Sequence, residues 1–140
     1  MTSPDTLVDA LTRTLRIFRR LVHEESRAAG LTQAQYNAMR YMMLHGERRM
    51  SELACYLELT NSATTGLIVG LCDRGFAVRR ADPEDGRAVL VDVTPVGAAA
   101  GEAIASRINE TIGQSFEAMS VPERYMAVGG LEALAAALEA

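Results

Sequence analysis

The sequence contains no lysine and no tryptophan, and only two cysteines occur among its 140 residues. Because Cys55 and Cys72 could form one bridge at most, the chain is not a disulfide-stabilised scaffold, and ordinary buried thiols are the simpler interpretation. No stretch approaches the roughly 20 consecutive apolar residues that a membrane-spanning helix needs. We therefore expect no membrane segment and one globular domain.

The segment Met1–Asp9 carries two acids and no basic residue. It lacks the basic-then-apolar order of a secretory signal, so we expect a cytoplasmic protein.

Positive charge is concentrated in the first two thirds of the chain. All 14 basic residues are arginines, and 12 of them lie between Arg13 and Arg87. From Glu102 onward two arginines face six acids, which accounts for much of the net charge of −4. The overall charge does not favour a nucleic-acid partner, although the middle of the chain has the arginines for a basic patch.

Helical signals surround a short strand-like region. A helix is predicted from Ser3-Pro4 to Gly30, and capping residues predict others opening at Thr32 and Thr60 and ending at Gly46 and Gly75. A short helix is expected around Ser51–Leu57, and two more follow Thr94-Pro95 and Ser120. The spacing of their apolar residues is helical throughout.

Between the helices, residues 77–80 and 88–93 have the period of strands, with a polar, turn-forming loop from Ala81 to Arg87. This order predicts a mainly α (α+β) fold: a winged helix-turn-helix with a two-stranded wing, flanked by amino- and carboxy-terminal helices. The second helix of the pair has the width to enter a DNA major groove.

Residues that open this helix are small and polar, as base-edge contacts require. We expect Asn61, Ser62, Thr64 and Thr65 to face the bases, and Arg87 at the hairpin tip to reach the adjacent minor groove. Arg40, Arg48, Arg49, Arg74, Arg79 and Arg80 are candidates for phosphate contacts. Taken singly, these features are more typical of helix caps, solvated turns and exposed side chains; their order along the chain favours DNA binding.

From Leu31 to Gly97 the chain resembles the MarR family of regulators. The resemblance rests on Leu-Thr with Gln35, on Ser-Glu-Leu-Ala from Ser51, on Thr65, on Arg74-Gly75, on the wing pattern of Asp82, Pro83, Asp85 and Arg87, and on Thr94 with Gly97. It implies one MarR-type domain over residues 1–140, with DNA-binding residues 31–94 and dimerisation helices in 1–30 and 95–140. It also places Arg74, Asp85 and Arg87 in the DNA-binding set.

The same resemblance implies a homodimer on double-stranded operator DNA and, in many members, release by a small lipophilic or phenolic effector. Phe18, Tyr36 and Met39 are candidates for an effector pocket, and they are equally suited to a plain core. This sequence departs from the family pattern at Val69, Gly70 and Gly86, where an acid and two arginines are common. Gly66 and Gly70 each cost a helix about 1 kcal/mol relative to alanine.

Other classes of protein fit less well. A redox-responsive regulator would need a reactive cysteine, and neither thiol lies in the first helix. His23 and His45 have no ligand spacing, so no metal and no cofactor are expected. No nucleophile elbow, phosphate loop or HExxH motif indicates an enzyme. A winged-helix protein-interaction module without DNA function stays open as the alternative.

Overall fold

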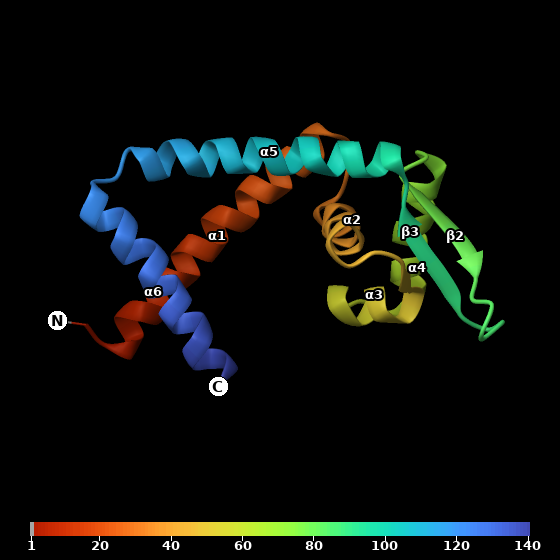
Figure 1. Ribbon diagram of the computed structural model, residues 1–140, viewed down its shortest axis with the longest axis horizontal. Coiled ribbons are helices and arrows are strands. Elements are labelled where there is room, and N and C mark those ends of the chain that lie inside the picture. Colours follow the sequence, from red (N-terminus) through yellow and green to blue (C-terminus); the bar gives the residue numbers. More distant parts are fainter. Residues whose placement is uncertain (1) are drawn as a thin grey trace. The chain divides into compact units, whose positions relative to one another are not determined.

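The computed structural model describes residues 2–140. Met1, the first residue of the segment that lacks a secretory signal pattern, lies outside the described residues. The chain divides into two compact units, residues 1–106 and 107–140. In chain order (Figure 1), the elements are α1 (Pro4–Ala28), α2 (Gln33–His45), β1 (Arg48–Arg49), α3 (Met50–Leu57), α4 (Asn61–Asp73), β2 (Ala77–Ala81), β3 (Val89–Val93), α5 (Pro95–Glu117) and α6 (Val121–Glu139). The residues of α5 contribute to both units.

Capping chemistry sets the helix boundaries close to the predicted ones. The capping box at α2 is complete: Thr32 Oγ1 accepts the Gln35 N–H at 3.1 Å, and Gln35 Oε1 accepts the Thr32 N–H at 3.0 Å. The helices predicted to end at Gly46 and Gly75 do so, with these glycines at φ +78° and +73°, a conformation that costs other residues more.

The core of the first unit is formed by the inner faces of α2, α3 and α4 together with strand β3. Its fully buried members include Met39, Met42, Leu53, Ile68, Leu71 and Val91. These side chains come from the helical and strand periods in the sequence, so their burial fixes the helix-turn-helix as one packed body.

The wing belongs to a three-stranded antiparallel sheet, in the order β1-β3-β2, so the predicted two-stranded wing is wrong in strand number. The hairpin pairs Ala77 with Val93 and Ala81 with Val89. The additional strand is Arg48–Arg49, which pairs with Val91 and Leu90 of β3. A strand of only two arginines is too short to show the alternating pattern of a strand in the sequence. Arg48 and Arg49 pair with β3 because they connect α2 to α3 and so lie beside its open edge.

A single residue, Thr94, joins β3 to α5. Its N–H donates to the Phe76 carbonyl at 3.0 Å, and its hydroxyl donates to the Gly75 carbonyl at 2.6 Å and accepts the Gly97 N–H at 3.0 Å. A Cβ at Gly97 would collide with the Phe76 carbonyl, so this position admits only glycine. The first turn of α5 is thereby held against the end of the α4–β2 connection.

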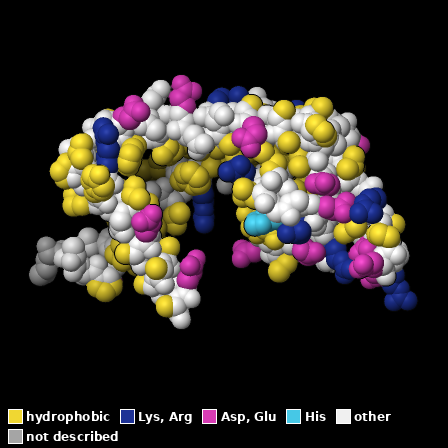
Figure 2. All heavy atoms as spheres, in the orientation of Figure 1, with side chains coloured by type: hydrophobic (Ala, Val, Ile, Leu, Met, Phe, Trp, Pro, Cys, Tyr) yellow, Lys and Arg dark blue, Asp and Glu magenta, His cyan; other side chains and the backbone are white. Residues whose placement is uncertain are grey.

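In the second unit, Ser120 and Glu123 form the predicted capping box of α6. The guanidinium of Arg124 donates to the Glu117 and Met119 carbonyls at the end of α5 and lies 5.6 Å from the Phe116 ring centre. Figure 2 shows hydrophobic surface over α6. The large apolar side chains that remain exposed on this helix include Tyr125, Met126, Val128, Leu131 and Leu138.

Candidate nucleic-acid interface

The amino-terminal turn of α4 presents exposed polar side chains. Thr60 is its N-cap, and its hydroxyl accepts the Ala63 N–H at 3.1 Å. Asn61 and Ser62 follow and are exposed, as predicted. A helix whose first turn is capped in this way is held rigidly, so these two side chains have a fixed origin from which to reach base edges.

The structure corrects the prediction for Thr64, which is fully buried. Thr64, Ile68 and Leu71 recur at intervals of four and three residues, so all three lie on the core face of α4. The Thr64 hydroxyl donates to the Thr60 carbonyl at 2.9 Å, which satisfies it inside the helix. Thr64 therefore cannot contact a base in this fold.

Thr65, the next residue, lies about 100° further round the helix and is half-buried. Its hydroxyl donates to the Asn61 carbonyl at 2.8 Å. The proton of this hydroxyl is therefore already committed within the helix. Toward a ligand, Thr65 offers a methyl group and a hydrogen-bond acceptor.

The loop at the tip of the wing is shaped by its own carboxylates. Asp85 Oδ1 accepts the Arg87 N–H at 3.1 Å, and Asp82 Oδ1 accepts the Glu84 N–H at 2.9 Å. The guanidinium of Arg87 makes no hydrogen bond or ion pair with any residue in the described part of the chain, and it is exposed. Asp85 therefore has a positioning role, and Arg87 is the side chain left to bind a partner.

A cleft of about 230 Å³ lies between the wing and the start of α4. It is lined by Asn61 from α4, Arg87 and Val89 from the wing, and Arg49 and Ser51 from β1 and α3. Two of the predicted site residues, Asn61 and Arg87, thus share one surface although they lie far apart in the sequence. Dark-blue basic side chains project beyond the hairpin at this end of the molecule (Figure 2).

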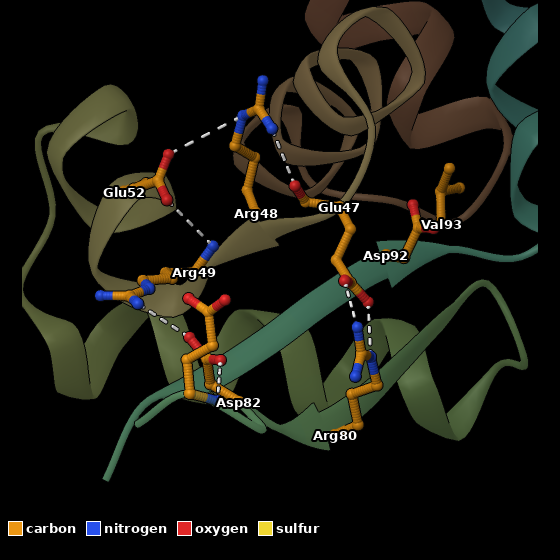
Figure 3. Close-up of polar contacts among 9 residues, drawn as sticks. Glu47, Arg48, Arg49, Glu52, Arg80, Asp82, Asp92 and Val93 are labelled. Carbon is orange, nitrogen blue, oxygen red and sulfur yellow. Dashed lines mark hydrogen bonds and ion pairs between the residues drawn. The ribbon is translucent and has the colours of Figure 1, made fainter. Parts of the chain in front are cut away.

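Ion pairs hold the wing against the β1 segment, as Figure 3 shows. Arg80 of β2 donates to both carboxylate oxygens of Glu47, at 2.9 and 2.7 Å. Arg49 of β1 lies 2.9 Å from the carboxylate of Asp82. We call these four residues the wing brace. Motif and charge patterns in the sequence single out Arg49, Arg80 and Asp82, but not for this role, and they give no signal for Glu47.

Hydrogen bonding keeps both acids of the wing brace ionised. The hydrogen bond from the Arg80 side chain lowers the pKa of Glu47. The backbone N–H of Glu84 and then the charge of Arg49 lower the pKa of Asp82, against the opposing effect of its burial. Because each carboxylate faces a guanidinium, Arg49 and Arg80 contribute little net positive charge to the surface of the wing.

Arg74, predicted to bind DNA, is placed at the carboxy-terminal end of α4. Its guanidinium donates to the Gly30 and Ala29 carbonyls at 2.7 and 3.1 Å and lies 4.6 Å from the Phe76 ring centre. It thus satisfies carbonyls at the end of α1, a role that the sequence pattern does not distinguish from phosphate binding. Its contact with DNA stays a prediction.

Two positions of α4, Val69 and Gly70, depart from the MarR-family pattern, and their surroundings in the structure differ. A Cβ at Gly70 would lie 2.8 Å from the amide nitrogen of Gln35, whereas nothing lies within 4 Å of a Cβ at Gly66. Val69 is partly exposed. Gly70 is therefore a close-approach position between α2 and α4, and Gly66 is open to substitution.

The candidate effector residues differ in exposure. Met39 has no accessible surface and Tyr36 has little, while Phe18 is exposed on α1. Burial raises the pKa of Tyr36, so its phenol stays protonated at neutral pH. Met39 is thus a core residue in this conformation, and an effector pocket at these positions stays a prediction.

Neither cysteine is paired with the other: Cys55 is exposed and Cys72 is half-buried. Burial raises the pKa of Cys72, which lowers its reactivity at neutral pH. Among the described residues, no group of three or more His, Cys, Asp or Glu side chains is arranged to hold a metal ion. No helix of this part of the chain is long and apolar enough to cross a membrane.

Part of this chain is similar in sequence to a known protein family. Residues 29–88, which include the helix-turn-helix and most of the wing, match the model of the MarR family. The match covers 60 of the 140 residues. Over this segment the chain is similar to the MarR family.

Solved structures extend the fold match beyond residues 29–88. RV1404 from Mycobacterium tuberculosis is 23% identical, with a TM-score of 0.85, over 98% of this chain and 95% of the other. MarR from E. coli is 23% identical, with a TM-score of 0.77, over 99% and 97%. MepR from Staphylococcus aureus is 16% identical, with a TM-score of 0.79, over 98% and 99%. Among curated proteins, no sequence matches this chain.

Proposed function

We propose that this chain regulates transcription by placing the first turn of α4 in a major groove of its operator, with Arg87 of the wing beside the neighbouring minor groove. The observation that carries the proposal is the cleft shared by Asn61 and Arg87, whose guanidinium has no partner among the described residues. Arginine inserted beside a narrow minor groove is favoured by its negative potential.

The test is a mobility-shift titration with DNA from upstream of the chain's own gene, at several salt concentrations. Log affinity should fall with log salt with a slope of about 0.9 per phosphate contacted. Arg87→Ala should weaken binding and reduce this slope by about 1. Arg13→Ala, which removes the same charge from α1, is the matched control and should leave both unchanged.

The alternative is a protein-interaction module without DNA function. It is favoured by the net charge of −4 and by the ion pairs that occupy Arg49 and Arg80. Failure to shift any candidate operator at low salt would support it. Unchanged affinity of Arg87→Ala in a protein that does bind would instead contradict the role of the wing.

A homodimer is the expected functional form. Support comes from α6, which has no buried residue in the single chain and carries exposed Tyr125, Met126 and Leu131. Two recognition helices should then lie about 34 Å apart, one turn of DNA. Light scattering should give a dimer that Leu131→Glu disrupts. Leu44→Glu, the same change at an exposed leucine of α2, should not disrupt it. A monomer at micromolar concentration would contradict this arrangement.

We also propose that the protein is a cytoplasmic repressor released by a small lipophilic or phenolic effector. Two structural neighbours support this: MepR is described as a regulator of a multidrug efflux pump, and a MepR-like protein 27% identical to this chain was crystallised with pseudoligands. Small phenols added to the mobility-shift assay should release the DNA. Substitution of exposed Phe18 should weaken that response without altering DNA affinity.

A further inference from the structure

The exposed side of α4 carries no charge over almost its whole length. From the first turn to Val69, its exposed residues are Asn61, Ser62, Ala63, Gly66 and Val69, with half-buried Thr65 beside them. From Thr60 to Cys72 the sequence contains no arginine, acid or histidine, and the first charged residue is Asp73 at the last position of the helix. The polar and apolar groups that this side of the helix can offer a partner are therefore amides, hydroxyls and methyl groups.

Each base offers the major groove a different set of contacts. Guanine is read best by the two donors of arginine, and cytosine by a carboxylate, which accepts from its amino group. Adenine is read by the amide of asparagine or glutamine, and thymine by apolar contact with its methyl group. The exposed side of α4 lacks the first two kinds of side chain and holds the last two.

We propose that α4 selects A·T base pairs, with Asn61 reading adenine and the methyl groups of Thr65 and Val69 contacting thymine methyls. This inference rests on the proposed DNA-binding function and names the class of operator that it recognises. The hydrogen bond from the Thr65 hydroxyl to the Asn61 carbonyl supports it, because it leaves Thr65 no free donor.

The open position at Gly66 supports the same conclusion. Gly66 and Val69 lie on the side of the helix that faces away from the buried Thr64 and Ile68, and half-buried Thr65 lies at the edge of that side. Nothing lies within 4 Å of a Cβ at Gly66, so the fold leaves space for a side chain to begin there. The absence of a guanine-reading arginine on this side is thus a property of the sequence and is not imposed by the fold.

The wing complicates any simple measurement of base preference. Arginine in a narrow minor groove also favours A·T tracts, so Arg87 alone would enrich them. The two grooves are separable chemically. An inosine·cytosine pair presents the minor-groove edge of A·T, because it lacks the guanine amino group, and the major-groove edge of G·C.

The experiment begins with selection of duplexes from a random library by the full-length protein. A·T pairs in the best site are then replaced one at a time by inosine·cytosine and by G·C. Where α4 reads the pair, both replacements should weaken binding about equally, by about tenfold or more for the adenine that Asn61 reads. Where Arg87 reads it, only G·C should weaken binding.

Two substitutions connect the preference to α4 itself. Asn61→Ala should remove the discrimination at one adenine while leaving the response to G·C under the wing unchanged. Gly66→Arg should introduce a guanine at one selected position, and Gly66→Ala is the control that alters the helix without adding donors. Replacing the thymines read by α4 with uracil should weaken binding about fourfold for each methyl lost.

The outcomes separate this inference from the function on which it rests. Selection of no sequence at all would contradict the proposed DNA-binding function. Selection of a site in which every A·T pair tolerates inosine·cytosine would leave that function standing and overturn the inference, because the preference would then lie in the minor groove. G·C pairs selected under α4, or a Gly66→Arg variant that gains no guanine, would overturn it as well.

Discussion

Arg80 and Glu47 are 33 positions apart in the sequence and are joined by two hydrogen bonds of 2.9 and 2.7 Å. The bond connects β2 to the residue preceding β1, so it spans the sheet from one outer strand to the other. The Arg49–Asp82 pair lies in the wing loop, two positions beyond Arg80, so both pairs hold the loop end of the hairpin. We therefore expect the position of Arg87 to depend on these two ion pairs.

Glu47→Gln should loosen the wing without unfolding the protein. Because this pair is exposed to solvent, the loss in unfolding free energy should be small. Hydrogen exchange of the β2–β3 amides should accelerate, and DNA affinity should fall. Glu84→Gln is the matched control, since it removes the same charge from the wing loop. If Glu47→Gln instead binds DNA more tightly, as Glu84→Gln would by reducing repulsion, the wing brace has no positioning role.

The wing brace should respond to acid and not to mild alkali. The pKa values of Glu47 and Asp82 are both lowered in the folded chain. Each therefore stabilises the fold above its unfolded pKa of about 4, and this contribution is lost as the pH falls through the lower folded value. Amide exchange in the wing, corrected for its intrinsic pH dependence, should be constant from pH 8 to about pH 5 and increase below about pH 4. A transition between pH 6 and pH 7 would contradict this assignment.

Asp85→Ala should weaken DNA binding although it removes a negative charge from the DNA-facing loop. The reason is that Asp85 accepts the Arg87 N–H and so sets the direction in which Arg87 leaves the loop. Asp85→Asn keeps a side-chain oxygen and should retain most of the affinity. Mobility-shift titrations of both variants at one salt concentration decide the point, and tighter binding by Asp85→Ala would refute it.

Arg74→Ala should affect stability rather than the salt dependence of DNA binding. It leaves the Gly30 and Ala29 carbonyls without their donor and removes the cation from the Phe76 ring, at a cost of about 1–3 kcal/mol. Thermal unfolding measures this loss. A reduced salt slope with unchanged stability would show instead that Arg74 binds a phosphate, as the sequence analysis predicted.

Local chemistry explains why the helices could be predicted from the sequence. Thr32 with Gln35 and Ser120 with Glu123 are contacts between residues three positions apart, so both capping boxes are visible in the sequence itself. Burial of Thr64 was equally visible, because Ile68 and Leu71 lie four and seven positions further on the same face. Its polar side chain led to the wrong prediction, although a helical threonine can donate to the carbonyl four residues earlier.

The wing brace and the third strand could not be predicted in this way. Both depend on the register that pairs Arg48 with Val91 and Arg79 with Val91, a relation between segments about 40 and 12 residues apart. The same applies to Arg74, whose partners lie 44 and 45 positions away. An exposed arginine and one that caps a distant helix look alike in a sequence.

The joint at Thr94 has a mechanical consequence. One residue separates β3 from α5, and its hydrogen bonds hold it to Gly75 and Phe76, where α4 passes into β2. Gly97 closes the remaining space against the Phe76 backbone. No flexible linker is present here to absorb a rotation. We therefore expect a rotation of the first turns of α5 to move the wing and the carboxy-terminal end of α4 with it.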